Sequence, residues 1–135
     1  MDIAALILWV ITAGGGFVLL AKWLMGGGAK PGTTSRLPAP VVFAHFLVAA
    51  VGLVLWIVYL IADVDALAWV SLALLVLLAL TGFGMVARWL PSVSRDAGEN
   101  NPPEKSFPLA VVAAHGVFAV ATIVTVVLTA VGIGG

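Results

Sequence analysis

The 135-residue sequence contains no cysteine and very little charge. Without cysteine, the protein can form neither disulfides nor thiolate metal sites, and it has no thiol nucleophile. Charged residues make up only 9% of the chain and apolar residues 63%, so polar side chains are too few to cover a water-exposed surface. These shortages exclude an ordinary soluble globular domain.

Four long apolar runs account for almost the whole chain. A helix of roughly 20 apolar residues, at about 1.5 Å per residue, crosses the hydrocarbon of a bilayer. We therefore expect an all-α membrane protein, with a single four-helix transmembrane domain over residues 1–135 and the lipid bilayer as its surroundings. The predicted spans are residues 3–25, 40–62, 67–90 and 108–133.

The distribution of charge predicts the orientation of these spans. All six cationic residues lie near two of the predicted loops, and the positive-inside rule then places both long loops in the cytoplasm and both termini outside, in what we expect to be a bacterial plasma membrane. The first span does not resemble a signal peptide, because Asp2 precedes it and no basic residue does. Cations spread over two loops form no aromatic-lined basic groove, so nucleic-acid binding is not expected. The six cations are Lys22, Lys30, Arg36, Arg88, Arg95 and Lys105.

The chain contains one membrane hairpin twice. Residues 16–24 match residues 82–90 with five of nine positions identical, and residues 37–45 match residues 107–115. The offset is 66 in the first block and 70 in the second, so the second hairpin has the longer loop. Because both hairpins run up and then down, the repeats are parallel, and a pseudo-twofold axis along the membrane normal should relate them. The repeats cover about residues 1–62 and 66–135.

The only two histidines, His45 and His115, occupy matching places in the two repeats. Prolines predict the starts of the second and fourth helices, and each histidine lies seven residues after Pro38 or Pro108, roughly 10 Å along a helix. An ionisable side chain at this depth is costly unless it has a partner or lines a cavity. If the second and fourth helices are diagonal, the axis brings the two imidazoles face to face.

A haem fits this pair better than a bare metal ion. Two neutral imidazole nitrogens can fill the axial positions of a haem iron, whereas bare zinc or copper would need further protein ligands that the spans do not offer. We therefore predict one b-type haem ligated by His45 and His115. Small residues on the histidine faces should leave room for the ring, and cations nearer the cytoplasm should pair with its propionates. The predicted surrounding residues are Ala49, Gly52, Gly116, Ala119, Thr122, Lys22, Arg36 and Arg88.

This arrangement resembles the four-helix membrane b-type cytochromes, including the core bundle of quinol-oxidising cytochrome b. The resemblance rests on Ala44-His45 and on Ala114-His115-Gly116, and it covers the whole four-span core. It implies a haem held between histidines of the second and fourth helices. The two-haem members have another histidine further along each helix, but fourteen residues after each histidine this chain has Tyr59 and Thr129. The resemblance therefore implies one haem only.

Several functions remain open at this level. The first is electron transfer or haem handling, with a quinone or another membrane redox subunit as partner. The second is a non-catalytic accessory subunit that stabilises a larger membrane complex, since polar groups elsewhere are scarce. The third is a small transporter or proton path, suggested by the repeat and the titratable pair. Histidine and small residues also pack membrane helices without any cofactor. Whether the protein is an enzyme, and whether it forms oligomers, stays open.

Three smaller features receive structural interpretations. The triplet Gly14-Gly15-Gly16 lacks the context of a phosphate-binding loop and predicts close helix contact. The third loop is expected to run from Pro91 to Ser106. Several aromatic residues near the span ends are interpreted as anchors at the membrane interface, namely Trp9, Trp23, Tyr59, Trp69 and Trp89.

Overall fold

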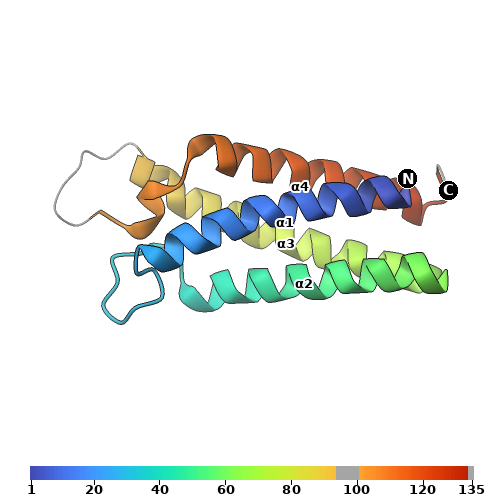
Figure 1. Ribbon diagram of the computed structural model, residues 1–135, viewed down its shortest axis with the longest axis horizontal. Coiled ribbons are helices and arrows are strands. Elements are labelled where there is room, and N and C mark those ends of the chain that lie inside the picture. The colour runs from blue at the N-terminus through green and yellow to red at the C-terminus, as the bar shows by residue number, and fades with distance from the viewer. Residues whose placement is uncertain (94–100, 134–135) are drawn as a thin grey trace.

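The computed structural model describes residues 1–93 and 101–133, and this part of the chain is helical with short connections (Figure 1). Each of the four long helices is long and apolar enough to cross a membrane, which confirms the four predicted spans. A short 3₁₀-helix, η1, precedes the last of them. The elements are α1 (Asp2–Met25), α2 (Ala39–Ala62), α3 (Asp65–Val93), η1 (Pro103–Ser106) and α4 (Leu109–Ala130).

The helices form an up-and-down bundle with both termini at one end and the long connections at the other (Figure 1). We call these the terminal end and the loop end. The closest packing is between α1 and α4 and between α2 and α3, so each tight pair contains one helix from each repeat. Within the described residues, the backbones of α2 and α4 do not approach each other, so these two helices occupy a diagonal, as the histidine prediction requires.

The two repeats start their second helices in the same way. Pro38 has φ −65° and ψ 124°, and Pro108 has φ −65° and ψ 123°, an extended conformation that ends the loop. The carbonyl of each proline then accepts the first helical N–H bonds, from residues three and four positions later. Burial also repeats: Gly52 and Thr122 are both buried at equivalent positions. The internal duplication is therefore visible in backbone and packing as well as in sequence.

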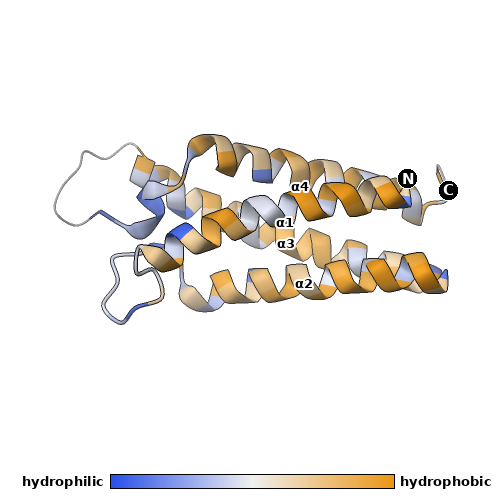
Figure 2. Ribbon diagram, in the orientation of Figure 1, coloured by the Kyte–Doolittle hydropathy of each residue, from blue (hydrophilic) through white to orange (hydrophobic). Residues whose placement is uncertain are grey.

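Apolar residues cover the outside of the bundle. Figure 2 shows hydrophobic colouring along most of the four helices and hydrophilic colouring near the two ends. Large apolar side chains such as Ile61, Phe83 and Val117 are exposed along these helices. In water such a surface would favour association or aggregation, whereas a lipid bilayer solvates it without cost.

The buried core lies in the terminal half of the bundle, around Trp9 and Trp56. The two indole rings are tilted against each other with centroids 6.4 Å apart. Trp9 is only 2% exposed, because its indole fills the space beside Gly52 of α2. Its interpretation as an interface anchor is therefore wrong. Trp69 is 51% exposed and remains available to the interface.

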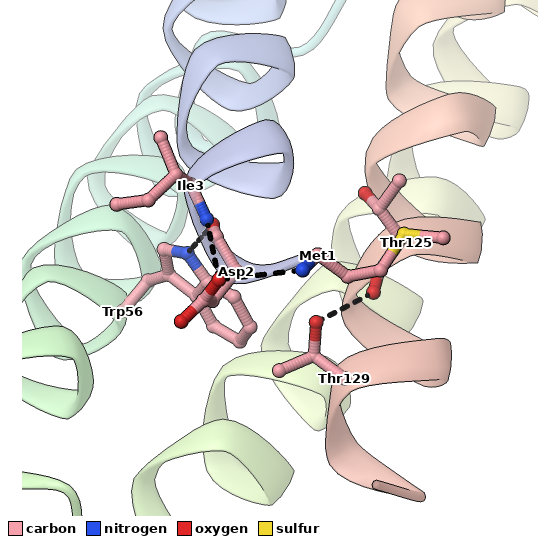
Figure 3. Close-up of polar contacts among 6 residues, drawn as sticks. All are labelled: Met1, Asp2, Ile3, Trp56, Thr125 and Thr129. Carbon is pink, nitrogen blue, oxygen red and sulfur yellow. Dashed lines mark hydrogen bonds and ion pairs between the residues drawn. The ribbon is translucent and has the colours of Figure 1, made fainter. Parts of the chain in front are cut away.

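Figure 3 shows hydrogen bonds at the terminal end, one of which joins α2 to α1, while the bond on α4 lies within that helix. The indole N–H of Trp56 donates to the carbonyl of Asp2 over 3.2 Å, which ties α2 to the start of α1. The Asp2 carboxylate accepts from the N–H of Ile3 at 3.0 Å and contacts the N-terminal ammonium at 3.3 Å. On α4, the Thr129 hydroxyl donates to the carbonyl of Thr125 at 3.0 Å. These bonds satisfy polar groups close to the helix ends.

Two predicted boundaries need correction. The helix α3 continues through Pro91 to Val93, because a proline in the last turn removes only one helical hydrogen bond. At the other boundary, α4 ends at Ala130 rather than at residue 133, because Gly132 adopts φ 77° and reverses the chain in a helix-terminating motif. The predicted loop at Pro91–Ser106 therefore begins later and ends in η1, and its cation Arg95 lies outside the described residues.

Candidate functional site

His45 of α2 and His115 of α4 meet in the interior of the bundle, although they lie on diagonal helices. Their ring centroids are 6.5 Å apart, and the ring planes are inclined at 57°. Both side chains are partly buried. Equal spacing from Pro38 and Pro108 places the two rings at the same depth, nearer to the loop end than to the terminal end. The structure therefore brings the two predicted residues together.

A hydrogen bond to the backbone determines the protonation pattern of His115. Its Nδ1 lies 2.8 Å from the carbonyl oxygen of Thr12 on α1. A carbonyl oxygen can only accept, so Nδ1 carries the hydrogen and donates it. In the neutral ring, Nε2 is then left with a lone pair, which is the form that binds a metal.

His45 reaches the same protonation pattern through a threonine hydroxyl. Its Nδ1 lies 2.9 Å from Oγ1 of Thr81 on α3. The carbonyl oxygens of Leu77 and Leu78 on the same helix each lie 3.0 Å from Oγ1 of Thr81 and are acceptors for its single hydroxyl hydrogen. The hydroxyl oxygen therefore accepts the Nδ1 hydrogen of His45. As a result, both imidazoles keep the Nε2 lone pair available.

The separation of the rings suits two ligands on one metal ion. A metal–imidazole bond is about 2 Å long and the ring centre lies roughly 1 Å behind the nitrogen, so two axial imidazoles have centres roughly 6 Å apart. The observed 6.5 Å between His45 and His115 is close to this value. In the described part of the chain, no group of three or more His, Cys, Asp or Glu side chains gathers to hold a metal. In that part of the chain, His45 and His115 are therefore two potential metal ligands without a third side chain of these types beside them.

Glycines of α1 lie against His115 of α4, and a glycine of α3 lies against His45 of α2. A Cβ atom on Gly16 would lie 3.1 Å from Cε1 of His115, and one on Gly82 would lie 3.6 Å from Cε1 of His45. Gly16 and Gly82 are equivalent in the repeat, so the contact occurs twice in pseudo-symmetric form. Gly15 also lies against His115, which confirms that the glycine triplet makes a close helix contact.

The predicted small residues divide into three environments. Gly52 is buried because the indole of Trp9 lies over it, 2.9 Å from the place that a Cβ atom would take, so the room at Gly52 holds a tryptophan. Thr122 is also buried, with its hydroxyl 3.4 Å from that of Thr12. Ala49 packs against the same core, and Ala119 is partly buried. Gly116 is exposed and has no atom within 4 Å of a Cβ position.

The predicted cations Lys22, Arg36 and Arg88 all lie toward the loop end. A guanidinium nitrogen of Arg88 donates to the backbone carbonyl of Arg36 over 3.4 Å, which links α3 to the α1–α2 connection. Among residues 1–93 and 101–133, none of the three cationic groups forms an ion pair with a carboxylate. Lys22 and Arg88 occupy equivalent repeat positions, six residues beyond Gly16 and Gly82.

A buried carboxylate at the loop end was not anticipated from the sequence. Glu104 of η1 is completely buried, and its carboxylate accepts hydrogen bonds from the Ser35 hydroxyl at 2.9 Å and from the Arg36 N–H at 2.6 Å. Its backbone carbonyl accepts from the indole of Trp89 at 3.0 Å, and the Ser35 hydroxyl oxygen accepts from the indole of Trp23 at 2.8 Å. These contacts join the α1–α2 and α3–α4 connections on the loop-end side of the histidines.

The interpretation of Trp23 and Trp89 as interface anchors is therefore wrong. Both indoles are buried, with 1% and 4% exposure, and their N–H groups bind the connections rather than lipid headgroups. The signal in the sequence was their equivalence in the repeat, at an offset of 66. Matched tryptophans at matched depths indicate a shared packing role as readily as an interface.

Fold and site together define a class: an all-α bundle of four helices long and apolar enough to cross a membrane, in which histidines from equivalent repeat positions meet. No family model, curated protein or solved structure matches the chain in the comparisons made with it.

Proposed function

We propose that the protein is a small integral membrane haem protein in which His45 and His115 ligate one b-type haem. The observation that carries the proposal is the histidine pair itself, with ring centroids 6.5 Å apart and both Nδ1 atoms engaged so that both Nε2 atoms are free. A bound haem would supply one-electron chemistry at its iron. The role that follows is electron transfer or haem handling, with a quinone or a neighbouring membrane subunit as the redox partner.

The chain contributes orientation and exclusion of water. Hydrogen bonds from Nδ1 hold a ligating imidazole in one tautomer and increase its basicity. Here the acceptors are the Thr12 carbonyl and the Thr81 hydroxyl, each on the helix that packs most closely against the histidine's own helix. Toward the terminal end, the buried core around Trp9 and Trp56 closes the bundle against water.

The positive charge at the loop end supports an orientation for the protein and for its haem. We propose that the loop end faces the cytoplasm, as expected from the excess of Lys and Arg there, in a bacterial plasma membrane. Lys22, Arg36 and Arg88 then lie on the side toward which two propionates would point. Charge-assisted hydrogen bonds between propionates and such cations are strong at a partly buried site.

Haem reconstitution with histidine variants tests the proposal. The purified full chain should show a low-spin, six-coordinate absorption spectrum after addition of haem. His45→Ala and His115→Ala should each lose this spectrum and weaken haem binding by at least roughly 100-fold, since even second-layer partners of a metal typically contribute 10- to 100-fold.

Thr129→Val is the matched control, because its hydroxyl bonds only to its own helix at the terminal end. It should retain the wild-type spectrum. An unchanged low-spin spectrum in either histidine variant would contradict the ligand assignment. Absence of any Soret shift in the wild-type protein with haem would remove the proposed function altogether.

A further inference from the structure

The pseudo-twofold symmetry of the bundle is broken at the two histidines. The Nδ1 of His115 donates to a backbone carbonyl, that of Thr12, which is fixed within α1. The Nδ1 of His45 donates to the hydroxyl of Thr81, a side-chain oxygen that is itself bonded to the backbone of α3. Thr81 corresponds to Gly15 in the first repeat, so no hydroxyl exists at the equivalent place beside His115.

The residues beside the two rings also differ. Cβ atoms added at Gly15 and Gly16 would each lie close to His115, at 3.4 Å from its Cβ and 3.1 Å from its Cε1. At the equivalent positions beside His45, the Thr81 hydroxyl bonds the ring, and a Cβ atom added at Gly82 would lie 3.6 Å from its Cε1. His115 is therefore bonded to the backbone of α1 and has two glycines of that helix against its ring, whereas His45 is bonded to a side chain of α3.

We propose that the two axial ligands are unequal, and that His45 yields its place to a small neutral diatomic ligand while His115 stays bound. The inference rests on the proposed haem function. A backbone carbonyl within a helix stays in position, so the ring bonded to it is the better oriented ligand; such second-layer contacts control metal affinity. Displacement of His45 breaks a bond to a side chain, whereas displacement of His115 would break a bond to the backbone of α1.

The exchange is a ligand substitution without redox chemistry. With the iron in the ferrous state, prepared with dithionite as the one-electron reductant, the bond from Nε2 of His45 to iron breaks and a bond from iron to the diatomic ligand forms. The free imidazole keeps its proton on Nδ1 and recovers its Nε2 lone pair. Carbon monoxide is the probe, because it binds ferrous haem and reports its partner ligand through its stretching frequency.

Vibrational spectroscopy identifies which histidine remains bound. The ferrous CO adduct of the wild-type chain should show the same C–O stretch as that of His45→Ala, because His115 lies opposite the ligand in both. The adduct of His115→Ala should differ. A wild-type frequency equal to that of His115→Ala overturns the inference, and so does a ferrous wild-type protein that stays six-coordinate under saturating CO.

A second variant tests the inference without removing a ligand. Thr81→Val removes the acceptor of His45 at nearly constant volume, and we expect the Kd for CO to fall about three- to tenfold, the equivalent of one neutral hydrogen bond. Thr125→Val is the matched control, because Thr125 bonds the backbone carbonyls three and four residues earlier, as Thr81 does, but touches neither histidine. Equal CO affinity in the two variants overturns the inference.

A measurement on the haem-free chain completes the test. In ¹⁵N-histidine NMR spectra, both rings should carry hydrogen on Nδ1, and the Nδ1 hydrogen of His115 should exchange with solvent more slowly than that of His45. Faster exchange at His115 overturns the inference. Failure of the wild-type chain to bind any haem removes the proposed function, whereas haem binding with an inert His45 removes only the inference made here.

Discussion

Replacing Glu104 with glutamine should loosen the loop end of the bundle. The carboxylate accepts from the Arg36 N–H and from the Ser35 hydroxyl, and Glu104 itself is completely buried while the two donor residues are partly buried. Glutamine keeps the shape but offers one acceptor oxygen, which the Arg36 N–H requires because it can only donate. Its NH₂ group then faces the Ser35 oxygen, which already accepts from Trp23 and from the N–H of Leu37.

The expected cost of Glu104→Gln is one hydrogen bond to a charged group, about 1.5–3 kcal/mol. Glu104→Ala loses both bonds and removes the acceptor of the Arg36 N–H, while the Ser35 hydroxyl can still donate to the Leu37 carbonyl 3.3 Å away, so its cost should be larger than that of glutamine. Thermal unfolding of the full chain in detergent, followed by circular dichroism, should show Tm values lowered by roughly 5–10 °C for glutamine and by more for alanine.

Ser106→Ala is the control in the same segment, because that exposed hydroxyl donates only to the nearby carbonyl of Pro103. Its Tm should stay within about 2 °C of wild type, as for most surface substitutions. Equal Tm values for the wild type and Glu104→Gln would refute the reasoning, since the buried carboxylate would then contribute nothing that an amide cannot. So would a glutamine variant as unstable as the alanine variant.

Two further predictions concern the helix contacts and the orientation. Gly16→Ala should weaken haem binding about fivefold, because the added methyl group would lie 3.1 Å from Cε1 of His115 and cost about 1 kcal/mol. Gly82→Ala should change the haem affinity less than about twofold in the same titration, because its methyl group would lie 3.6 Å from Cε1 of His45, an ordinary contact distance. Since the chain has no cysteine, Thr33→Cys and Val64→Cys can be labelled singly with a membrane-impermeant maleimide: in intact cells Val64→Cys should react and Thr33→Cys should not, and the opposite pattern would reverse the proposed orientation.

The sequence predicted the four helices, their order and the matched depth of the histidines. Those predictions depend on long apolar runs and on prolines at helix starts, which act locally and survive any tertiary arrangement. The meeting of His45 and His115 also followed from the repeat, because a twofold axis brings equivalent side chains together when their helices are diagonal. The ring separation of 6.5 Å agrees with that expectation.

Other features depend on contacts between segments far apart in the chain, and the sequence did not predict them. The acceptors of the two Nδ1 hydrogens, on Thr12 and Thr81, do not occupy equivalent repeat positions, so symmetry gave no indication of them. The burial of Glu104 depends on donors 69 and 68 residues away in the first loop. Trp9 looked like an interface residue because its depth along α1 is visible in the sequence, but the direction in which its ring packs is not.

The crosswise pairing of α1 with α4 and of α2 with α3 has a consequence for the origin of the fold. Neither hairpin makes its closest helix contact within itself, so a lone hairpin would be an incomplete protein that had to associate with a second copy to bury the same surfaces. Two such copies would necessarily present identical surroundings to their histidines. Within one chain that constraint is absent: Thr81 occupies the position equivalent to Gly15, so the two histidines have different surroundings.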